Sequence, residues 1–295
     1  MTARISKKNK LGAFDLAAAG ILLLLAAMFV YPLWYILVAA LSDPLEVVKD
    51  PLLVVPKGLT LYNFSMLFSS ATIWLGYANT LLYVAVGTAI NVGLTVVMAY
   101  ALAQPELPYR RQFNFLVVLT MFFSGGMIPG YLLVKNLGML DTIWAIVLPG
   151  GIATYNLMIT RTYLNQQIPR DLIEAAEVDG SGEYRTFFQI VLPLSTPILA
   201  VITLFYASGH WNSFFSALIY LQSRSKYPLQ LILREMLIQD QTLGMMEVET
   251  TSLIALYTIT LKYAVMTVSI LPLLILFPFV QGFFVKGVMI GAIKG

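Results

Sequence analysis

The chain has 295 residues, of which 59% are hydrophobic and 11% charged, and its mean hydropathy is +0.80. This composition excludes an ordinary water-soluble domain and indicates several membrane spans, because each crossing needs about 20 apolar residues. The absence of cysteine and the single histidine exclude a disulfide framework and argue against a metal cluster, while a net charge of +3 gives no indication of nucleic-acid binding.

The first apolar segment follows a short basic N-terminus at residues 1–15. An uncharged run of 27 residues extends from Leu16 to Ser42. A cleavable signal peptide has an apolar region of only about 7–15 residues. The segment is therefore predicted to remain as a first membrane span at 16–41, with 1–15 on the cytoplasmic side.

Five further spans are predicted, at 76–102, 113–134, 142–160, 194–221 and 262–285, within one transmembrane domain at 16–285. The expected fold class is an all-α integral membrane protein with six transmembrane helices. Gly125-Gly126 interrupts the third span and Pro149-Gly150-Gly151 the fourth. Such breaks are tolerated where neighbouring helices satisfy the freed backbone groups, or they line a cavity, as in transporters. The sequence leaves both alternatives open.

The distribution of basic residues predicts that both termini are cytoplasmic. The connections at 43–70 and 222–256 become long external loops, and 286–295 becomes a cytoplasmic tail. Of the 18 lysines and arginines, this topology places eleven inside, on short segments, as the positive-inside rule expects: Arg4, Lys7, Lys8, Lys10, Arg110, Arg111, Arg161, Arg170, Arg185, Lys286 and Lys294.

The cytoplasmic loop predicted at 161–193 contains a short helix. Pro169 followed by Asp171 predicts its start. Backbone N–H groups in the first turn have no acceptor within the helix, so the N–H that proline lacks is not missed there, and an acidic side chain is stabilised by the positive end of the helix dipole. Gly180 and Gly182 predict its end. The helix would carry an acidic stripe at three-residue spacing with smaller residues beside it: Asp171, Glu174 and Glu177, and Leu172, Ala175 and Ala176. The pattern predicts a helix presented to a partner, with a solvated acidic loop as the alternative.

The same loop carries a recognisable spacing. Glu174-Ala175-Ala176, Gly180, Ile190 and Leu192-Pro193 resemble the EAA signature of permease subunits in binding-protein-dependent ABC importers. The resemblance implies a type I ABC importer permease fold and a coupling helix that docks into a cytoplasmic ATPase. The coupling residues it implies are Asp171, Leu172, Glu174, Ala175, Ala176, Glu177, Asp179 and Gly180.

A polar cluster lies deep in the fifth predicted span. If the helix starts just after Pro193, His210 is some 16 residues along it, roughly 24 Å into a ~30 Å hydrocarbon layer. Ionisable groups at that depth normally face a protein interior or a water-filled path, and an indole beside polar groups suits a sugar. The pattern predicts a substrate pathway at Tyr206, His210, Trp211 and Asn212. A helix-packing hydrogen bond at an interface with another permease and a membrane-interface belt are the alternatives.

Further segments resemble the six-span permease of maltose-type carbohydrate importers: Asn79-Thr80-Leu81, Gly209-His210-Trp211-Asn212-Ser213 and the ending 284–295. Gly125-Gly126-Met127-Ile128-Pro129 and Tyr227-Pro228-Leu229-Gln230 resemble a subgroup for complex oligosaccharides. The resemblance implies a location in the cell (inner) membrane and four partners. These are a second, different permease, a cytoplasmic ATPase dimer, an extracellular or periplasmic solute-binding protein, and a sugar or oligosaccharide.

The sequence contains no G-x-x-x-x-G-K-[ST] phosphate-binding loop and no catalytic constellation. The protein is therefore not expected to be an enzyme or to hold a cofactor, and ATP and Mg²⁺ are expected on the partner ATPase. An ABC permease for an amino acid, peptide or metal is the closest alternative. A secondary transporter, with acids inside its spans and internal repeats, and a membrane assembly or sensor protein are more distant ones.

Overall fold

The computed structural model describes residues 12–245, 260–275 and 278, and within these ranges all regular secondary structure is helical. The chain divides into two compact units. One comprises Met1–Ser69 and Asp240–Val268, and the other comprises Ser70–Gln239 and Ser269–Gly295. Residues 1–11 of the predicted N-terminus, 246–256 of the predicted second external loop, most of the predicted sixth span beyond residue 275, and the predicted cytoplasmic tail lie outside the described residues.

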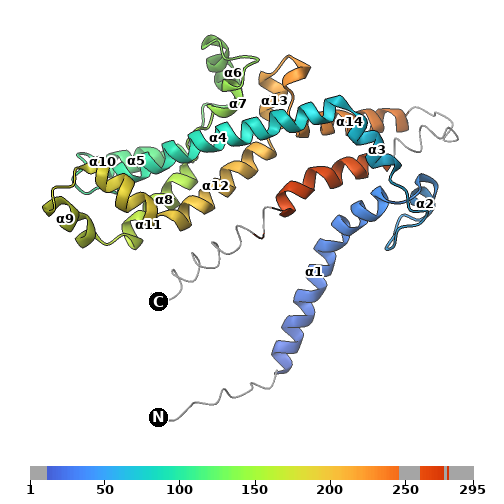
Figure 1. Ribbon diagram of the computed structural model, residues 1–295, viewed down its shortest axis with the longest axis horizontal. Coiled ribbons are helices and arrows are strands. Elements are labelled where there is room, and N and C mark those ends of the chain that lie inside the picture. Colours follow the sequence, from blue (N-terminus) through green and yellow to red (C-terminus); the bar gives the residue numbers. More distant parts are fainter. Residues whose placement is uncertain (1–11, 246–259, 276–277, 279–295) are drawn as a thin grey trace. The chain divides into compact units, whose positions relative to one another are not determined.

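The first unit contains the long helix α1 (Ala13–Ala40), followed by the short helices α2 (Pro44–Lys49) and α3 (Tyr62–Ser69) (Figure 1). The end of α1 packs with α2 and the following loop through Val38, Val47 and Leu53. The rest of α1 exposes apolar side chains on all sides. A helix that is apolar all round is typical of a membrane span rather than of the surface of a soluble domain.

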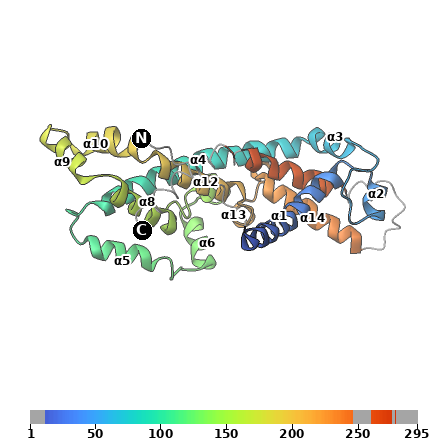
Figure 2. The same ribbon diagram turned by 90° about the horizontal axis from the view of Figure 1, so that it is seen from below.

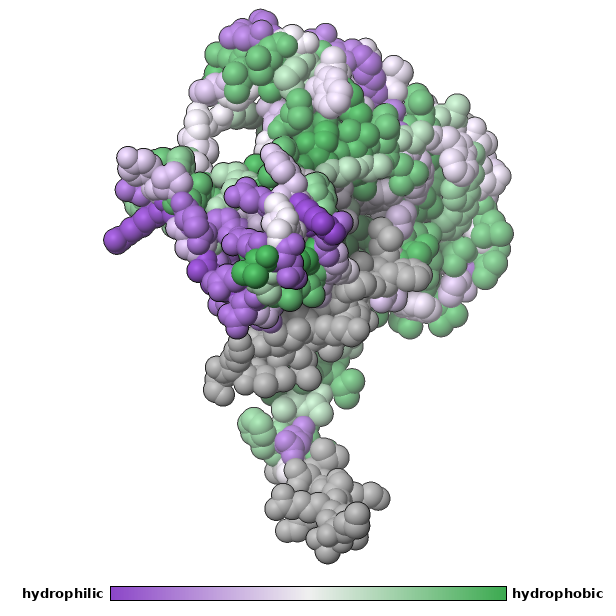
Figure 3. Space-filling model, turned by 60° about the vertical axis from the view of Figure 1, so that its left-hand side comes forward, coloured by the Kyte–Doolittle hydropathy of each residue, from purple (hydrophilic) through white to green (hydrophobic). Residues whose placement is uncertain are grey.

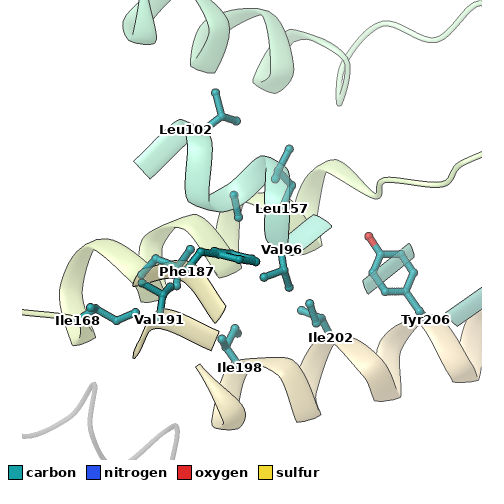
Figure 4. Close-up of a cluster of buried hydrophobic side chains, with 11 residues drawn as sticks. Val96, Leu102, Leu157, Ile168, Phe187, Val191, Ile198, Ile202 and Tyr206 are labelled. Atoms are coloured by element: carbon teal, nitrogen blue, oxygen red, sulfur yellow. The ribbon is translucent and has the colours of Figure 1, made fainter. Parts of the chain in front are cut away.

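The second unit is built on α4 (Ala71–Ala103), which runs alongside α8 (Thr154–Gln167) and α12 (Thr196–Trp211) (Figures 1 and 2). Buried side chains from these helices form one apolar core, to which the segment before α12 adds Phe187 and Val191 (Figure 4). Val96 and Ile202 are almost fully buried in it. This core therefore holds α8, the 187–191 segment and α12 against α4.

Between α4 and α8 the helices are short. The predicted span 113–134 consists of α5 (Arg110–Leu119) and α6 (Met127–Asn136), and the predicted span 142–160 contains α7 (Trp144–Val147) and the first half of α8. Gly126 and Gly150 lie in the two breaks with positive φ angles of 85° and 74°. Glycine adopts this backbone conformation without the steric cost of a side chain, which explains where the helices are interrupted.

The predicted fifth span, 194–221, contains α12 and α13 (Phe215–Tyr220), and the last part of the predicted loop 161–193 is helical as well. Helix α10 (Glu183–Thr186) continues into the π-helix η1 (Phe187–Val191) and α11 (Leu192–Leu194). The chain then bends by 78° before α12. Helix α12 ends at Trp211, and α13, the 3₁₀ turn η2 (Arg224–Lys226), α14 (Leu229–Met245) and a helix over Thr260–Ile275 follow.

Two described helices are long and apolar enough to cross a membrane, Phe14–Ala40 and Ala71–Ala103, or three if the bent pair around Ser195 is one span. The other predicted spans correspond to helical pieces that are each shorter than the roughly 20 residues a straight crossing needs. Six crossings therefore remain a prediction.

A polar connection joins the α6–α7 turn to the segment after α13. The Asp141 carboxylate accepts hydrogen bonds from the backbone N–H of Gln222 and of Ser223, both 3.0 Å, and pairs with Lys226 Nζ at 2.8 Å. The bond from Lys226 is the main cause that lowers the pKa of Asp141 well below its usual range. The resulting stabilisation is present above the ordinary aspartate pKa and is lost only as the pH falls through the lowered value.

Candidate functional site

The short helix α9 (Arg170–Val178) forms where the sequence predicts a coupling helix. Pro169 precedes its first turn, and the helix ends in a Schellman motif at Gly180, which has a φ of 79°. Gly180 N–H donates to Glu177 O and Ser181 N–H donates to Ala176 O, both at 2.9 Å. Because this φ strains any L side chain, the glycine determines where the helix ends.

Helix α9 has one buried edge and one exposed face. Ala176 is 8% exposed, and Ile173 packs against the main core. The exposed residues include most of those predicted for coupling: Asp171, Leu172, Glu174, Ala175, Glu177, Asp179 and Gly180. Within the described part of the chain, neither Glu174 nor Glu177 forms an ion pair. The acidic stripe is therefore available to a partner.

Two exposed apolar residues beside this stripe were not among the predicted coupling residues. Val178, at the end of α9, is 88% exposed, and Tyr184, on α10, is 83% exposed. Exposed apolar side chains beside a charged rim often mark interaction sites. The sequence does place these two apolar residues on either side of Gly180 and Gly182, where the helix is predicted to end, and this placement could have indicated the exposed pair.

A groove of about 730 Å³ lies between the end of α4, α9 and the α10–η1 segment. Arg170 and Glu106 approach to 3.8 Å across it, and Tyr100 and Phe187 contribute aromatic walls. Figure 3 brings this side of the molecule forward and shows hydrophilic residues gathered there with apolar residues between them. The exposed face of α9 and this groove together form a mixed acidic and aromatic surface.

The second predicted site, on α12, is tied to α4 and to the α7–α8 break. His210 Nε2 lies 2.8 Å from Asn91 Oδ1, and Asn91 Nδ2 donates to Gly151 O at 2.7 Å. Tyr206 Oη accepts from Ala153 N–H at 3.0 Å. Side chains of α4 and α12 thus form hydrogen bonds with backbone groups that the break in the fourth predicted span leaves without helical partners. This agrees with the alternative in which neighbouring helices satisfy the freed backbone groups.

The contact between α4 and α12 is unusually close at Gly87. A Cβ atom at this position would lie 2.4 Å from His210 Nε2. Gly87, Asn91 and Thr95 recur every fourth residue and therefore share one face of α4. Sequence analysis missed this face, although its four-residue spacing of small and polar residues in an apolar helix is a visible signal.

The remaining members of the predicted substrate pathway differ in accessibility. Trp211 is 5% exposed, and its indole N–H donates to Ser269 O at 3.2 Å. Asn212 is exposed, and its amide donates to Ser208 O at 2.8 Å. Tyr206 and Trp211 are buried and His210 is half-buried, so the exposed Asn212 is the most accessible of the four.

Residues 87–290 match the family model described as the binding-protein-dependent transport system inner membrane component. The chain belongs to this family. It is a permease component of an ABC importer, as the EAA resemblance predicts.

Curated relatives and a solved structure agree with this assignment. The chain is 38% identical to the polygalacturonan/rhamnogalacturonan transport system permease protein YtcP of Bacillus subtilis (strain 168), over 98% of this chain and 100% of the relative. It is 39% identical to protein LplC of the same organism, over 91% and 90%. A crystal structure of a bacterial ABC transporter involved in the import of the acidic polysaccharide alginate matches with a TM-score of 0.83, 29% identity, and 96% and 100% coverage.

Proposed function

We propose that this permease forms, with a second and different permease, the path by which an oligosaccharide crosses the cell membrane. A separate ATPase dimer supplies the energy, and an extracellular binding protein delivers the sugar. The single observation that carries the coupling role is α9, an exposed acidic helix whose end is determined by Gly180 and whose inner edge packs on the core.

The contacts of α9 suggest how a docked ATPase moves the permease. Ile173 packs against the same core that holds Phe187, Val191 and Ile202. Interiors of this kind are close-packed, so a displacement of α9 is transmitted to α12 rather than absorbed locally. From α12 the hydrogen bonds of Tyr206 and His210 lead to α4 and to the α7–α8 break.

The carbohydrate class is supported by the relatives. Their names include polygalacturonan/rhamnogalacturonan, arabinooligosaccharides in Halalkalibacterium halodurans at 30% identity, and, for the solved structure, alginate. We assign the substrate pathway to the side of α12 that carries Asn212, with Tyr206, His210 and Trp211 holding that helix in position.

An experiment on the assembled complex tests the function. Purification through a tag on this chain is expected to recover a second permease and an ATPase. Reconstituted with the binding protein, the complex should take up an oligosaccharide only when ATP is supplied. Uptake by this chain without an ATPase, or uptake of an amino acid or a metal ion instead of an oligosaccharide, would contradict the proposal.

The proposed topology has six spans and both termini in the cytoplasm, which places 161–193 inside and 222–256 outside. Because the chain has no cysteine, single cysteines report it cleanly. In intact cells a membrane-impermeant maleimide is expected to label Ser225→Cys, whereas Gly182→Cys should react only after the membrane is opened. Both positions are exposed on the chain itself, and labelling of Gly182→Cys from outside would overturn the coupling role of α9.

A further inference from the structure

An arginine on α14 lies against an aromatic ring and has no anionic partner in the part of the chain that the structure describes. The Arg234 guanidinium carbon is 4.8 Å from the centroid of the Phe214 ring. Among the described side chains of residues 12–238 and 260–275, none forms a hydrogen bond or ion pair with the Arg234 guanidinium. The two basic residues that precede it are both paired, Arg224 with Glu235 at 3.2 Å and Lys226 with Asp141 at 2.8 Å.

Rigid elements hold this guanidinium in place. The N-terminus of α14 is fixed to α4, because Leu229 N–H donates to Thr80 Oγ1 at 2.8 Å and Ile232 is 2% exposed. Phe214 lies in the turn between α12 and α13, two residues after the exposed Asn212. Arg234 is itself partly buried. The charge therefore stands at a defined point beside the end of α12.

The chemistry of this pair favours a particular ligand. A partly buried cation without an anion has lost hydration that a carboxylate can replace, and the planar guanidinium binds a carboxylate through two parallel hydrogen bonds. Phe214 remains 36% exposed and offers an apolar face to a sugar ring. A uronic acid, which is a sugar that carries a carboxylate, satisfies both groups at once.

We propose that Arg234, supported by Phe214, binds a uronic-acid carboxylate of the transported oligosaccharide. This inference rests on the proposed import of oligosaccharides and narrows it to acidic ones. The names of two similar proteins, which include polygalacturonan and the acidic polysaccharide alginate, agree with that class. Arabinooligosaccharides, named for another relative, are neutral. The family as a whole therefore does not imply an acidic substrate.

The test compares acidic and neutralised forms of the same sugar. Uptake of trigalacturonate, of trimannuronate and of their methyl esters is measured in the assembled importer. The variants are Arg234→Gln, Arg234→Lys and, as a matched control, the exposed and ion-paired Arg224→Gln. At subsaturating substrate, Arg234→Gln is expected to slow the uptake of at least one of the two acids about tenfold, because a charge-assisted hydrogen bond to the carboxylate is lost. The uptake rate of the methyl ester of the same acid should not change. Arg234→Lys should restore part of the rate, and Arg224→Gln should resemble the wild type.

The other outcomes overturn the inference. Equal losses on an acid and its ester would assign Arg234 to folding, to a lipid phosphate or to another subunit. An unchanged rate for Arg234→Gln, or a wild-type importer that accepts the esters and not the acids, would exclude a carboxylate site while leaving oligosaccharide import intact. A wild-type complex that transports no oligosaccharide at all would refute the proposed function first, and this inference with it.

Discussion

Replacing Glu174 by lysine is expected to abolish uptake while the protein still reaches the membrane. Glu174 is exposed near the middle of α9 and has no ion pair within the described residues. The substitution places a positive charge in a surface that we expect to receive a basic residue of the ATPase. Leaving one member of a partly buried pair without its partner costs roughly 3–5 kcal/mol, which corresponds to a loss of more than about 100-fold in productive docking.

The measurement is ATP-dependent uptake, normalised to the amount of permease in the membrane. Arg111→Glu is the matched control, because it reverses another exposed charge on the proposed cytoplasmic side, on α5 rather than α9. It should retain near-normal uptake. Wild-type transport by Glu174→Lys would show that the acidic stripe takes no part in coupling.

Replacing Gly87 by leucine is expected to disrupt the packing of α4 on α12. Three ring atoms of His210 lie 2.4 to 2.8 Å from the position of a Cβ at Gly87. The side chain would displace the imidazole and break its contact with Asn91. Overpacking of this kind costs about 1–3 kcal/mol, and the loss of this partly buried hydrogen bond adds about 1 kcal/mol.

Thermal unfolding of the purified subunit measures the effect, with Gly93→Leu as the control. Gly93 lies on the same helix, and nothing in the described chain comes within 4 Å of its Cβ position. A clearly lower Tm for Gly87→Leu than for Gly93→Leu is expected. His210→Ala removes the obstructing ring, so Gly87→Ala should lower the Tm less in the His210→Ala background than in the wild type. Equal Tm values for the two leucine variants would refute the close contact.

Local features of the chain could be predicted from the sequence because they depend on neighbouring residues. The uncharged runs around α1 and α4 predict long apolar helices, since hydropathy is additive along a segment. The start near Pro169 and the stop at Gly180 follow from the backbone preferences of those two residues. The spacing from Glu174 to Pro193 indicates the permease family, which the family match to residues 87–290 confirms.

The lengths of the middle helices could not be predicted in the same way. The predicted spans at 113–134 and 142–160 are each divided, and the segment at 183–211 bends by 78°. Glycine and proline indicate that a break is possible, but whether it forms depends on partners for the freed backbone groups. Asn91 and Tyr206 provide such partners from helices elsewhere in the chain.

The class of protein, the family and the position of α9 follow from the sequence alone, because composition, spacing and turn residues are local properties. Which polar residues already have partners is a property of the packed fold. The fold brings His210 to Asn91, 119 positions away, and Lys226 to Asp141, and it leaves Arg234 beside Phe214 with no anion among the described side chains. Pairings of this kind depend on how distant helices pack, which no local pattern specifies.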